Sequence, residues 1–246
     1  MMTHRFFIPT HWITPPTVAF EGDVARQIRK VLRMQPGQTL AVLDNTGREW
    51  QVQLTEVRQD LVRGRIIGQG WAQGEPRLHL TLYQGSLKAQ KFELILQQGT
   101  ELGISRFVPT VCRRSVVSDM EALDKKQERW QRIIKEAAEV NGRGLLPQLE
   151  PAMPFEQAVR HAYAAPLRIM LWEEAAGFSL KTALAQNRAG KVALFIGPEG
   201  GFTAEEAGLA RQLGCQVVGL GPRILRAETA GLVAAAAIFY ELGDWD

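Results

Sequence analysis

Hydrophobic and polar positions along the first 67 residues alternate with the period of short β-strands. Strands are expected at 5–8, 39–43, 50–57 and 61–67, with one helical stretch near 24–33. Between the second and third strands, Asp44-Asn45-Thr46-Gly47 has the residues of a hairpin turn, because Asn and Gly adopt positive φ at low cost. Several short strands in so little chain predict a small β-barrel.

A different pattern begins after a glycine-rich segment, Gly68 to Pro76, which is the best candidate for a linker. From Leu78 onward, apolar strand-like runs alternate with helical patterns. Strands are expected at 78–83, 107–111, 167–172, 192–196 and 216–220, and helices at 88–103, 119–141, 203–213 and 228–242. This alternation predicts the α/β class, with a mostly parallel sheet covered by helices.

Three helix ends carry local signals. Ser118-Asp119-Met120-Glu121 and Thr203-Ala204-Glu205-Glu206 have the pattern of capping boxes. Asn141-Gly142 is expected to end the long helix with a left-handed residue. A chain of this length accommodates a small domain joined to a medium one.

Composition narrows the class of protein. Hydrophobic residues are 46% and charged residues 22%, which excludes a mostly disordered chain. The longest apolar run, Leu232 to Tyr240, is too short to span a bilayer, and no apolar signal core follows Met1, so a cytoplasmic location is expected. Cys112 and Cys215 are expected to be buried, and the four histidines have no ligand spacing, so no metal is expected.

Positive charge is clustered in the first part of the chain. Lys and Arg exceed Asp and Glu by 29 to 26, a net charge of +3. Arg26, Arg29, Lys30 and Arg33, called the basic stripe here, would share one face of an α-helix. The stripe is either a phosphate-binding surface or a solvated helix face.

Two glycine-containing loops follow the last expected strands, where α/β sheets bind their ligands. The first is Gly197-Pro198-Glu199-Gly200-Gly201-Phe202, which matches neither a dinucleotide fingerprint nor a phosphate-binding P-loop. Its Glu199 would repel a pyrophosphate, so the loop favours a ligand with hydroxyls or a positive centre, such as S-adenosylmethionine. A tight structural turn is the alternative.

The second loop, Gly221-Pro222-Arg223-Ile224-Leu225-Arg226, places two arginines beside a turn and favours an electron-rich partner. Glu228 follows as a candidate acid or base, although a carboxylate in a first helical turn is also favoured by the helix dipole. The alanine-rich helix after it fits either a subunit interface or core packing. A weaker third loop at Glu173-Glu174-Ala175 follows the strand that ends near Trp172.

Several separated motifs, in a shared order, resemble the ribosomal small subunit methyltransferase E family, a SPOUT-class group that methylates uridine N3 in 16S ribosomal RNA. The two glycine loops and Glu228-Thr229-Ala230 carry the resemblance. Further blocks extend it over nearly the whole chain: Val31-Leu32-Arg33-Met34 with Pro36-Gly37, Thr100-Glu101-Leu102-Gly103, Arg114-Ser115-Val116-Val117, and Glu136-Ala137-Ala138-Glu139 with Gly142-Arg143.

The resemblance implies a PUA-like RNA-binding barrel at 1–72 and a SPOUT methyltransferase domain at 76–246 whose chain forms a trefoil knot. It also implies S-adenosylmethionine as cofactor, a homodimer, and 16S ribosomal RNA, within the small subunit, as partner; no membrane partner is expected. Two departures stand out. Gln97-Gln98-Gly99 replaces a usual Gln-Lys pair, and Trp172-Glu173 replaces a usual His-Pro pair.

Site residues follow from the loops and the resemblance together. For cofactor binding we predict Leu171, Trp172, Ile196, Gly197, Pro198, Glu199, Gly200, Gly201, Leu220, Gly221, Ile224, Leu225, Arg226, Thr229 and Ala230. For catalysis we predict Arg226, Glu228 and Arg143. For RNA contacts we predict Arg5, Arg29, Lys30, Arg33, Arg113, Arg114 and Arg143.

Two other functions compete with this one. A non-catalytic RNA-binding ribosome assembly factor could use the same barrel and basic stripe. A nucleotide-dependent oxidoreductase would fit the α/β pattern, but the glycine fingerprint and its distant acidic residue are missing from the sequence.

Overall fold

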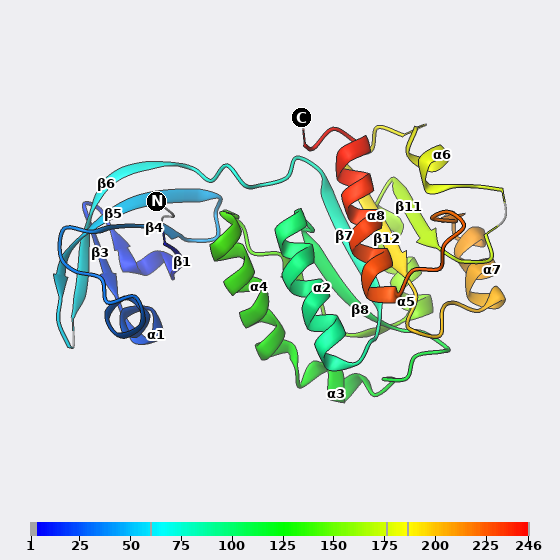
Figure 1. Cartoon of the computed structure of the whole chain (residues 1–246), viewed down its shortest axis with the longest axis horizontal. Coiled ribbons are helices and arrows are strands. Elements are labelled where there is room, and N and C mark those ends of the chain that lie inside the picture. The colour runs from blue at the N-terminus through cyan, green and yellow to red at the C-terminus, as the bar shows by residue number, and fades with distance from the viewer. Residues whose placement is uncertain (1–3, 60, 176, 186, 246) are drawn as a thin grey trace. The chain divides into compact units, whose positions relative to one another are not determined.

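The computed structural model describes residues 4–59, 61–175, 177–185 and 187–245. They fall into two compact units, residues 1–75 with 138–146 and residues 76–137 with 147–246 (Figure 1). The predicted domain boundaries at 72 and 76 stay a prediction. The compact units differ from the predicted domains in that residues 73–75 and segment 138–146 belong to the first unit. Met1 to Thr3, on which the expectation of no signal segment depends, lie outside the described residues.

The first unit is built on a sheet whose strand order is β1-β4-β5-β6-β3-β2. β1 pairs with β4 in parallel, and the other neighbours are antiparallel. Its elements are β1 (Arg5–Phe7), a 3-10 turn (Thr10–Trp12), β2 (Ile13–Thr14), β3 (Thr17–Phe20), α1 (Gly22–Arg26), a π-helical turn (Gln27–Val31), β4 (Thr39–Leu43), β5 (Arg48–Val57) and β6 (Val62–Trp71).

The alternating pattern in this unit is confirmed. In β5, Trp50, Val52 and Leu54 are buried, whereas Gln51 between them is exposed and Gln53 is half-buried. The predicted hairpin turn also forms. Asn45 and Gly47 have φ of 65° and 87°, and they join antiparallel strands β4 and β5. One face of the sheet therefore encloses the core of the unit.

Two predictions for this unit are wrong. Gly68 to Trp71 are not linker, because β6 continues through them and pairs with β5. The stretch 24–33 is not one α-helix either: α1 ends at Arg26, a π-helical turn follows, and Arg33 has a φ of 53°. The spacing that would align the basic stripe is therefore lost, since it requires 3.6 residues per turn throughout.

The second unit contains a parallel sheet with the order β10-β8-β7-β12-β11-β13, and β9 pairs with β8. Its elements are β7 (His79–Gly85), α2 (Ala89–Leu102), β8 (Arg106–Val111), α3 (Met120–Asp124), α4 (Gln127–Asn141, whose last residues belong to the first unit), β9 (Gln148–Leu149), β10 (Met153–Pro154), α5 (Phe155–His161), a 3-10 turn (Ala162–Ala164), β11 (Leu167–Leu171), α6 (Leu180–Ala185), β12 (Lys191–Ile196), α7 (Ala204–Gln212), β13 (Gln216–Val218) and α8 (Ala227–Glu241).

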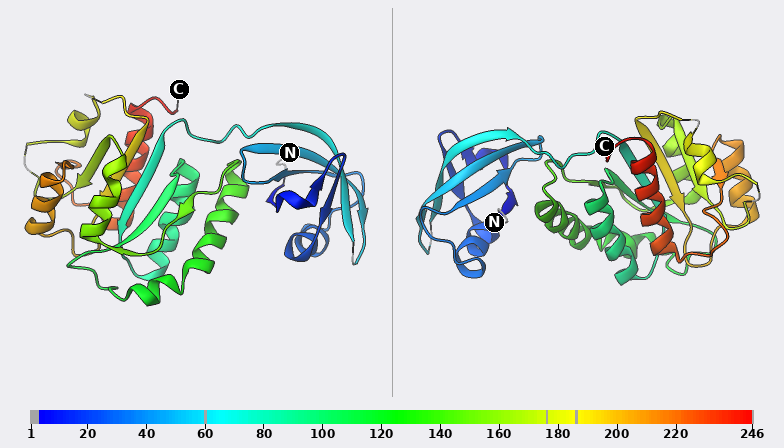
Figure 2. Two further views of the ribbon diagram at one scale, coloured as in Figure 1. Left: turned by 180° about the vertical axis from the view of Figure 1, so that it is seen from behind. Right: turned by 45° about the horizontal axis from the view of Figure 1, so that its top comes forward.

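Helices cover both faces of this sheet, as Figure 2 shows from two directions. α2, α4, α6 and α8 pack on one face, where Leu82 and Leu194 lie in a large apolar cluster with Phe92 and Ile238. α5 and α7 pack on the other face around Phe195. The expected α/β architecture is confirmed, and both faces of the strands are buried as a parallel sheet requires.

Some of the predicted helix ends in the second unit are confirmed, and others are wrong. The capping box at Thr203 is present with both of its hydrogen bonds, and Gly142 ends α4 with a φ of 71°. The helix expected at 119–141 is instead α3 and α4, and Asp119, not Ser118, caps the first of them. The helices α5 and α6 were not predicted. The trefoil knot stays a prediction.

Across the residues that the structure describes, no helix combines the length and the hydropathy needed to cross a bilayer.

Candidate functional site

A cavity of about 790 Å³ opens at the carboxyl ends of β11, β12 and β13, within the second unit. Its volume is typical of pockets that enclose a small molecule. Because parallel neighbours end at the same edge of the sheet, the loops after these three strands converge there. Ile196, Leu171 and Leu220 bring the ends of these strands or the loops that follow them into its wall.

The first wall is the loop from Gly197 to Phe202, between β12 and α7. Gly201 has a φ of 69°, and a Cβ at this position would also overlap a carboxylate oxygen of Glu173. The loop is fixed at its far end by the Thr203 capping box, in which Thr203 N donates to Glu206 Oε2 at 2.9 Å. The backbone of this loop therefore has one well-defined path beside the cavity.

The last residues of β7 contact the first residues of this loop. The buried side chain of Gln84 donates from Nε2 to the carbonyl of Gly197 at 3.3 Å. Next to it, Gly85 lies so close to the loop that a Cβ there would overlap the backbone of Gly197 and Pro198. Both residues are part of the site that the sequence analysis missed.

The second wall is the loop from Gly219 to Arg226, between β13 and α8. Gly221 has a φ of 109°, and the Ile224 side chain is 89% exposed, which is unusual for so large an apolar group. Arg226 is exposed at the N-cap position of α8, so both its side chain and the start of the helix border the cavity.

The third wall follows β11, where the sequence signal was weak. Trp172 is buried there, and the guanidinium of Arg211 lies 5.3 Å from the centroid of its ring. Phe178 and Ser179 complete this wall although no motif marks them. They were missed because only the folded chain brings the start of α6 to the same edge of the sheet.

Charged groups meet at one point of the cavity. Lys91, in the first turn of α2, places Nζ 3.3 Å from Glu228 Oε1 and 3.7 Å from Glu199 Oε1. The other oxygen of Glu228, Oε2, is buried and has no hydrogen-bond partner among the described residues. Lys91 was missed because no motif marks it, although α2 follows β7, whose carboxyl end lies at the same edge of the sheet.

Most predicted cofactor residues lie together in this cavity. Its lining includes Leu171, Trp172, Ile196, Gly197, Pro198, Glu199, Gly200, Gly201, Leu220, Gly221, Ile224, Leu225, Arg226 and Ala230, together with Glu228. Thr229 is not among the described residues that line it, and its side chain is exposed on α8.

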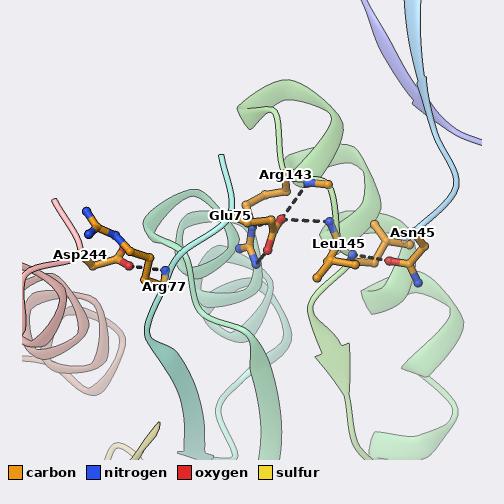
Figure 3. A network of polar contacts seen from close by, with 8 residues as sticks. Asn45, Glu75, Arg77, Arg143, Leu145 and Asp244 are labelled. Carbon is orange, nitrogen blue, oxygen red and sulfur yellow. Dashed lines mark hydrogen bonds and ion pairs between the residues drawn. The ribbon is translucent and has the colours of Figure 1, made fainter. Parts of the chain in front are cut away.

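Arg143 is found elsewhere, in the first unit. Its side chain is only 3% exposed and it forms an ion pair with Glu75, with Nε 2.9 Å from Oε1 and NH2 3.2 Å from Oε2 (Figure 3). Glu75 Oε1 also accepts from the backbone N–H groups of Gly144 and Leu145, and Asn45 accepts from that of Leu146. These contacts organise the segment after α4, and the catalytic and RNA-binding roles of Arg143 stay predictions.

A second cluster in Figure 3 belongs to the other unit. Asp244 Oδ1, after α8, accepts from the backbone N–H of Arg77 at 2.6 Å and from that of Leu78 at 3.2 Å. The end of the chain is thereby attached to the start of β7.

The predicted RNA-contact residues belong to both units, and their contacts within the protein differ. Arg5 forms an ion pair with Glu49 at 3.1 Å. Arg29 donates to the carbonyls of Arg58 and Gln59. Arg114 donates to the carbonyls of Gly200, at 3.1 Å, and Phe202. Lys30, Arg33 and Arg113 are exposed.

The two cysteines do not line the cavity. Cys112 and Cys215 are free and buried, as predicted; burial raises the pKa of both thiols, that of Cys215 to about 11. Among the described residues, no three His, Cys, Asp or Glu side chains gather as a metal-binding group.

Comparisons with known proteins agree with this geometry. A family model described as an RNA methyltransferase domain matches residues 74–239, and one described as an RNA methyltransferase PUA domain matches residues 20–67. The chain is 33% identical to the ribosomal RNA small subunit methyltransferase E of Bacillus subtilis, over 92% of this chain and 91% of that protein. It is 35% identical to the Synechocystis protein of the same name, over 97% and 78% of the two chains.

Among solved structures, the Neisseria gonorrhoeae protein of this name, bound to S-adenosylmethionine, superposes with a TM-score of 0.87 at 28% identity, covering 99% of this chain and all of that one. The first unit is therefore PUA-like, and the second matches an RNA methyltransferase domain. On its sequence, its fold and the position of its cavity, the chain belongs to the ribosomal RNA small subunit methyltransferase E family.

Proposed function

We propose that the chain is an S-adenosylmethionine-dependent methyltransferase that methylates N3 of a uridine in 16S ribosomal RNA. The observation that carries the proposal is the cavity at the carboxyl edge of the parallel sheet, bounded by the two glycine loops that the sequence singled out. Membership of the family supports the reaction and the substrate. The resemblance further supports a cytoplasmic homodimer that acts on RNA within the small subunit.

The residues of the cavity fit this cofactor better than a phosphate-bearing one. Glu199 and Glu228 both line the cavity, and their carboxylates would repel a pyrophosphate but attract a sulfonium. A Cβ at Gly200 would meet Arg114, and one at Gly201 would meet Glu173, so the packing of the loop requires glycine at both positions. The absence of side chains there also leaves the backbone groups of the loop open to adenosine. Glu228 lines the cavity, and its buried Oε2 is an acceptor without a donor among the described residues, so a small change of its side-chain torsion would let it accept from a ligand.

Bound there, S-adenosylmethionine would supply an electrophilic methyl group. The residues of the chain must then align uridine N3 with that group and exclude water. The N3–H proton has to leave as the N–C bond forms and the S–C bond breaks, and the carboxylate of Glu228, which lines the cavity, is assigned to accept it. Arg226, which is exposed beside the cavity, is assigned to stabilise the negative charge that spreads onto the uracil carbonyl oxygens.

A mapping experiment tests the overall proposal. Small ribosomal subunits from cells that lack this protein are incubated with the chain and labelled S-adenosylmethionine, and the modified nucleotide is then mapped. A single N3-methylated uridine in 16S RNA is expected. Binding of RNA without methyl transfer, and without heat of cofactor binding in calorimetry, would instead identify a non-catalytic assembly factor.

Roles of individual residues require single-turnover measurements. Replacing Arg226 by Ala is expected to slow methylation by about 100-fold at saturating RNA and cofactor, because a charge-stabilising donor is worth a few kcal/mol in the transition state. An unchanged rate would remove Arg226 from the chemical step.

A further inference from the structure

Lys91 lines the cavity, and the proposed reaction assigns no role to it. It lies in the first turn of α2, and Figure 1 shows α2 and α8 on the same face of the sheet. Its ammonium contacts Glu228, from α8, at 3.3 Å and Glu199, from the first glycine loop, at 3.7 Å. One cation thus joins carboxylates from two other elements.

These three charges are shielded from water to different degrees. The side chains of Glu228, Glu199 and Lys91 are 12%, 26% and 34% exposed, so their interactions are screened less than those of surface pairs. Two carboxylates and one ammonium leave one net negative charge in this cluster, while Glu173, Arg223 and Arg226 line other parts of the cavity. Without Lys91 the net negative charge of the cluster would double, since no second cation is paired with Glu199 or Glu228 among the described residues.

We propose that Lys91 sets the local charge around Glu199 and Glu228 and thereby limits the preference of the cavity for the cationic cofactor, S-adenosylmethionine, over the neutral product, S-adenosylhomocysteine. This inference rests on the proposed function. The two ligands share the adenosine and the amino acid and differ only in the methyl group and the charge on sulfur. A residue that acts through charge therefore changes the ratio of their affinities, whereas a residue that acts through packing changes both affinities together.

The benefit of a moderated charge follows from the chemistry. Methyl transfer converts a sulfonium into a neutral thioether, so positive charge on sulfur is lost on the way to the transition state. A strongly negative cavity would stabilise the bound cofactor more than the transition state and would slow the reaction. Lys91 offsets part of that negative charge while leaving both carboxylates in place.

Calorimetry with both ligands tests the proposal at low ionic strength. The ratio of the dissociation constant of S-adenosylhomocysteine to that of S-adenosylmethionine is measured for the native chain and for variants. Lys91→Met is expected to raise this ratio about tenfold, the size of one unit charge acting over several ångströms in a half-buried site. Lys91→Arg keeps the charge and is expected to restore the native ratio.

Two further variants exclude a general loss of structure. Glu199→Gln removes a negative charge and is expected to change the ratio about tenfold in the opposite direction. Lys88→Met, at an exposed position just before the same helix, is expected to leave the ratio unchanged. Opposite shifts from two residues of one cavity cannot arise from damage to the fold.

Three results would overturn the inference. They are an unchanged ratio in Lys91→Met, equal weakening of both ligands, and the same shift in Lys88→Met. Failure of the proposed function has a different signature, because the native chain would then bind neither ligand, and the charge-setting role would be lost with it.

Discussion

The predicted cofactor residues and the predicted RNA-contact residues differ in their surroundings in the folded protein. Nearly all the predicted cofactor residues share one cavity in the second unit. The predicted arginines belong to two units, and several have partners within the protein: Glu49 for Arg5, loop carbonyls for Arg29, and Glu75 for Arg143. The first set lies in loops whose place is fixed by the sheet, and the second set is defined only by charge.

This difference has a physical basis. The carboxyl ends of parallel strands converge at one edge, so loops that follow buried strands must meet. A long charged side chain has no such constraint, and it can satisfy its donors on any carbonyl or carboxylate within reach. An arginine chosen from sequence is therefore as readily an internal hydrogen-bond donor as a contact for phosphate.

The largest expected effect is a loss of stability in Arg143→Ala, and it tests whether Arg143 stabilises the fold or acts in the reaction. Arg143→Ala is expected to destabilise the protein by about 3 kcal/mol, because the partly buried carboxylate of Glu75 loses its buried counter-charge. Arg160→Ala, which breaks an exposed pair with Glu156, is the control and is expected to cost less than about 0.5 kcal/mol. Urea unfolding measures both. If Arg143→Ala keeps its stability but loses methylation, Arg143 acts in the reaction.

A slightly smaller effect is expected where β7 meets the first glycine loop. Gly85→Ala places a methyl group against the backbone of Gly197 and Pro198, which cannot yield as a flexible side chain does. We expect a loss of about 2 kcal/mol in stability and at least a tenfold loss in cofactor affinity. Gly208→Ala in α7 adds its methyl group in open space and should be neutral or stabilise by up to about 1 kcal/mol. Normal cofactor binding by Gly85→Ala would show that the loop does not need this close support.

A third prediction separates two neighbours in the basic stripe. Lys30→Gln is expected to reduce the slope of log binding constant against log salt by about 0.7 to 0.9, because Lys30 is exposed and available to phosphate. Arg29→Gln is expected instead to destabilise the protein by about 1 kcal/mol, since its guanidinium donates to two loop carbonyls. RNA titrations across salt concentrations and urea unfolding distinguish them. Equal salt slopes for Lys30→Gln and the native chain would identify a solvated residue.

The smallest expected effect concerns the two thiols. Burial raises the pKa of Cys215 to about 11, so about one molecule in a thousand carries the thiolate at pH 8; the pKa of Cys112 is raised further. Thiol reagents should therefore react slowly with the folded protein and rapidly after unfolding in urea. Fast reaction of either cysteine in the native state would contradict the burial seen here.

Prediction from sequence succeeded where a local pattern reports a local constraint. The alternation in β5 follows from one buried face, and the Thr203 capping box satisfies backbone donors within one turn. It failed where neighbours along the chain did not determine the result. Glycines at 68 and 70 indicate a linker, yet pairing with β5 keeps them in a strand, and the π-helical turn displaces the basic stripe from a common face. In the site, Lys91 and Phe178 had no motif because their importance depends on residues far away in the sequence.

The amino-acid sequence by itself determined the alternation of strands and helices and the two glycine loops, because each depends on residues close together in the chain. The order of motifs that marks the family can also be read directly from the sequence. Only the tertiary structure decided that Lys91 joins Glu199 to Glu228, that Gly85 supports the first loop and that Arg143 is paired with Glu75. These contacts link residues separated by many positions, and their energies depend on distance and burial, which no local pattern contains.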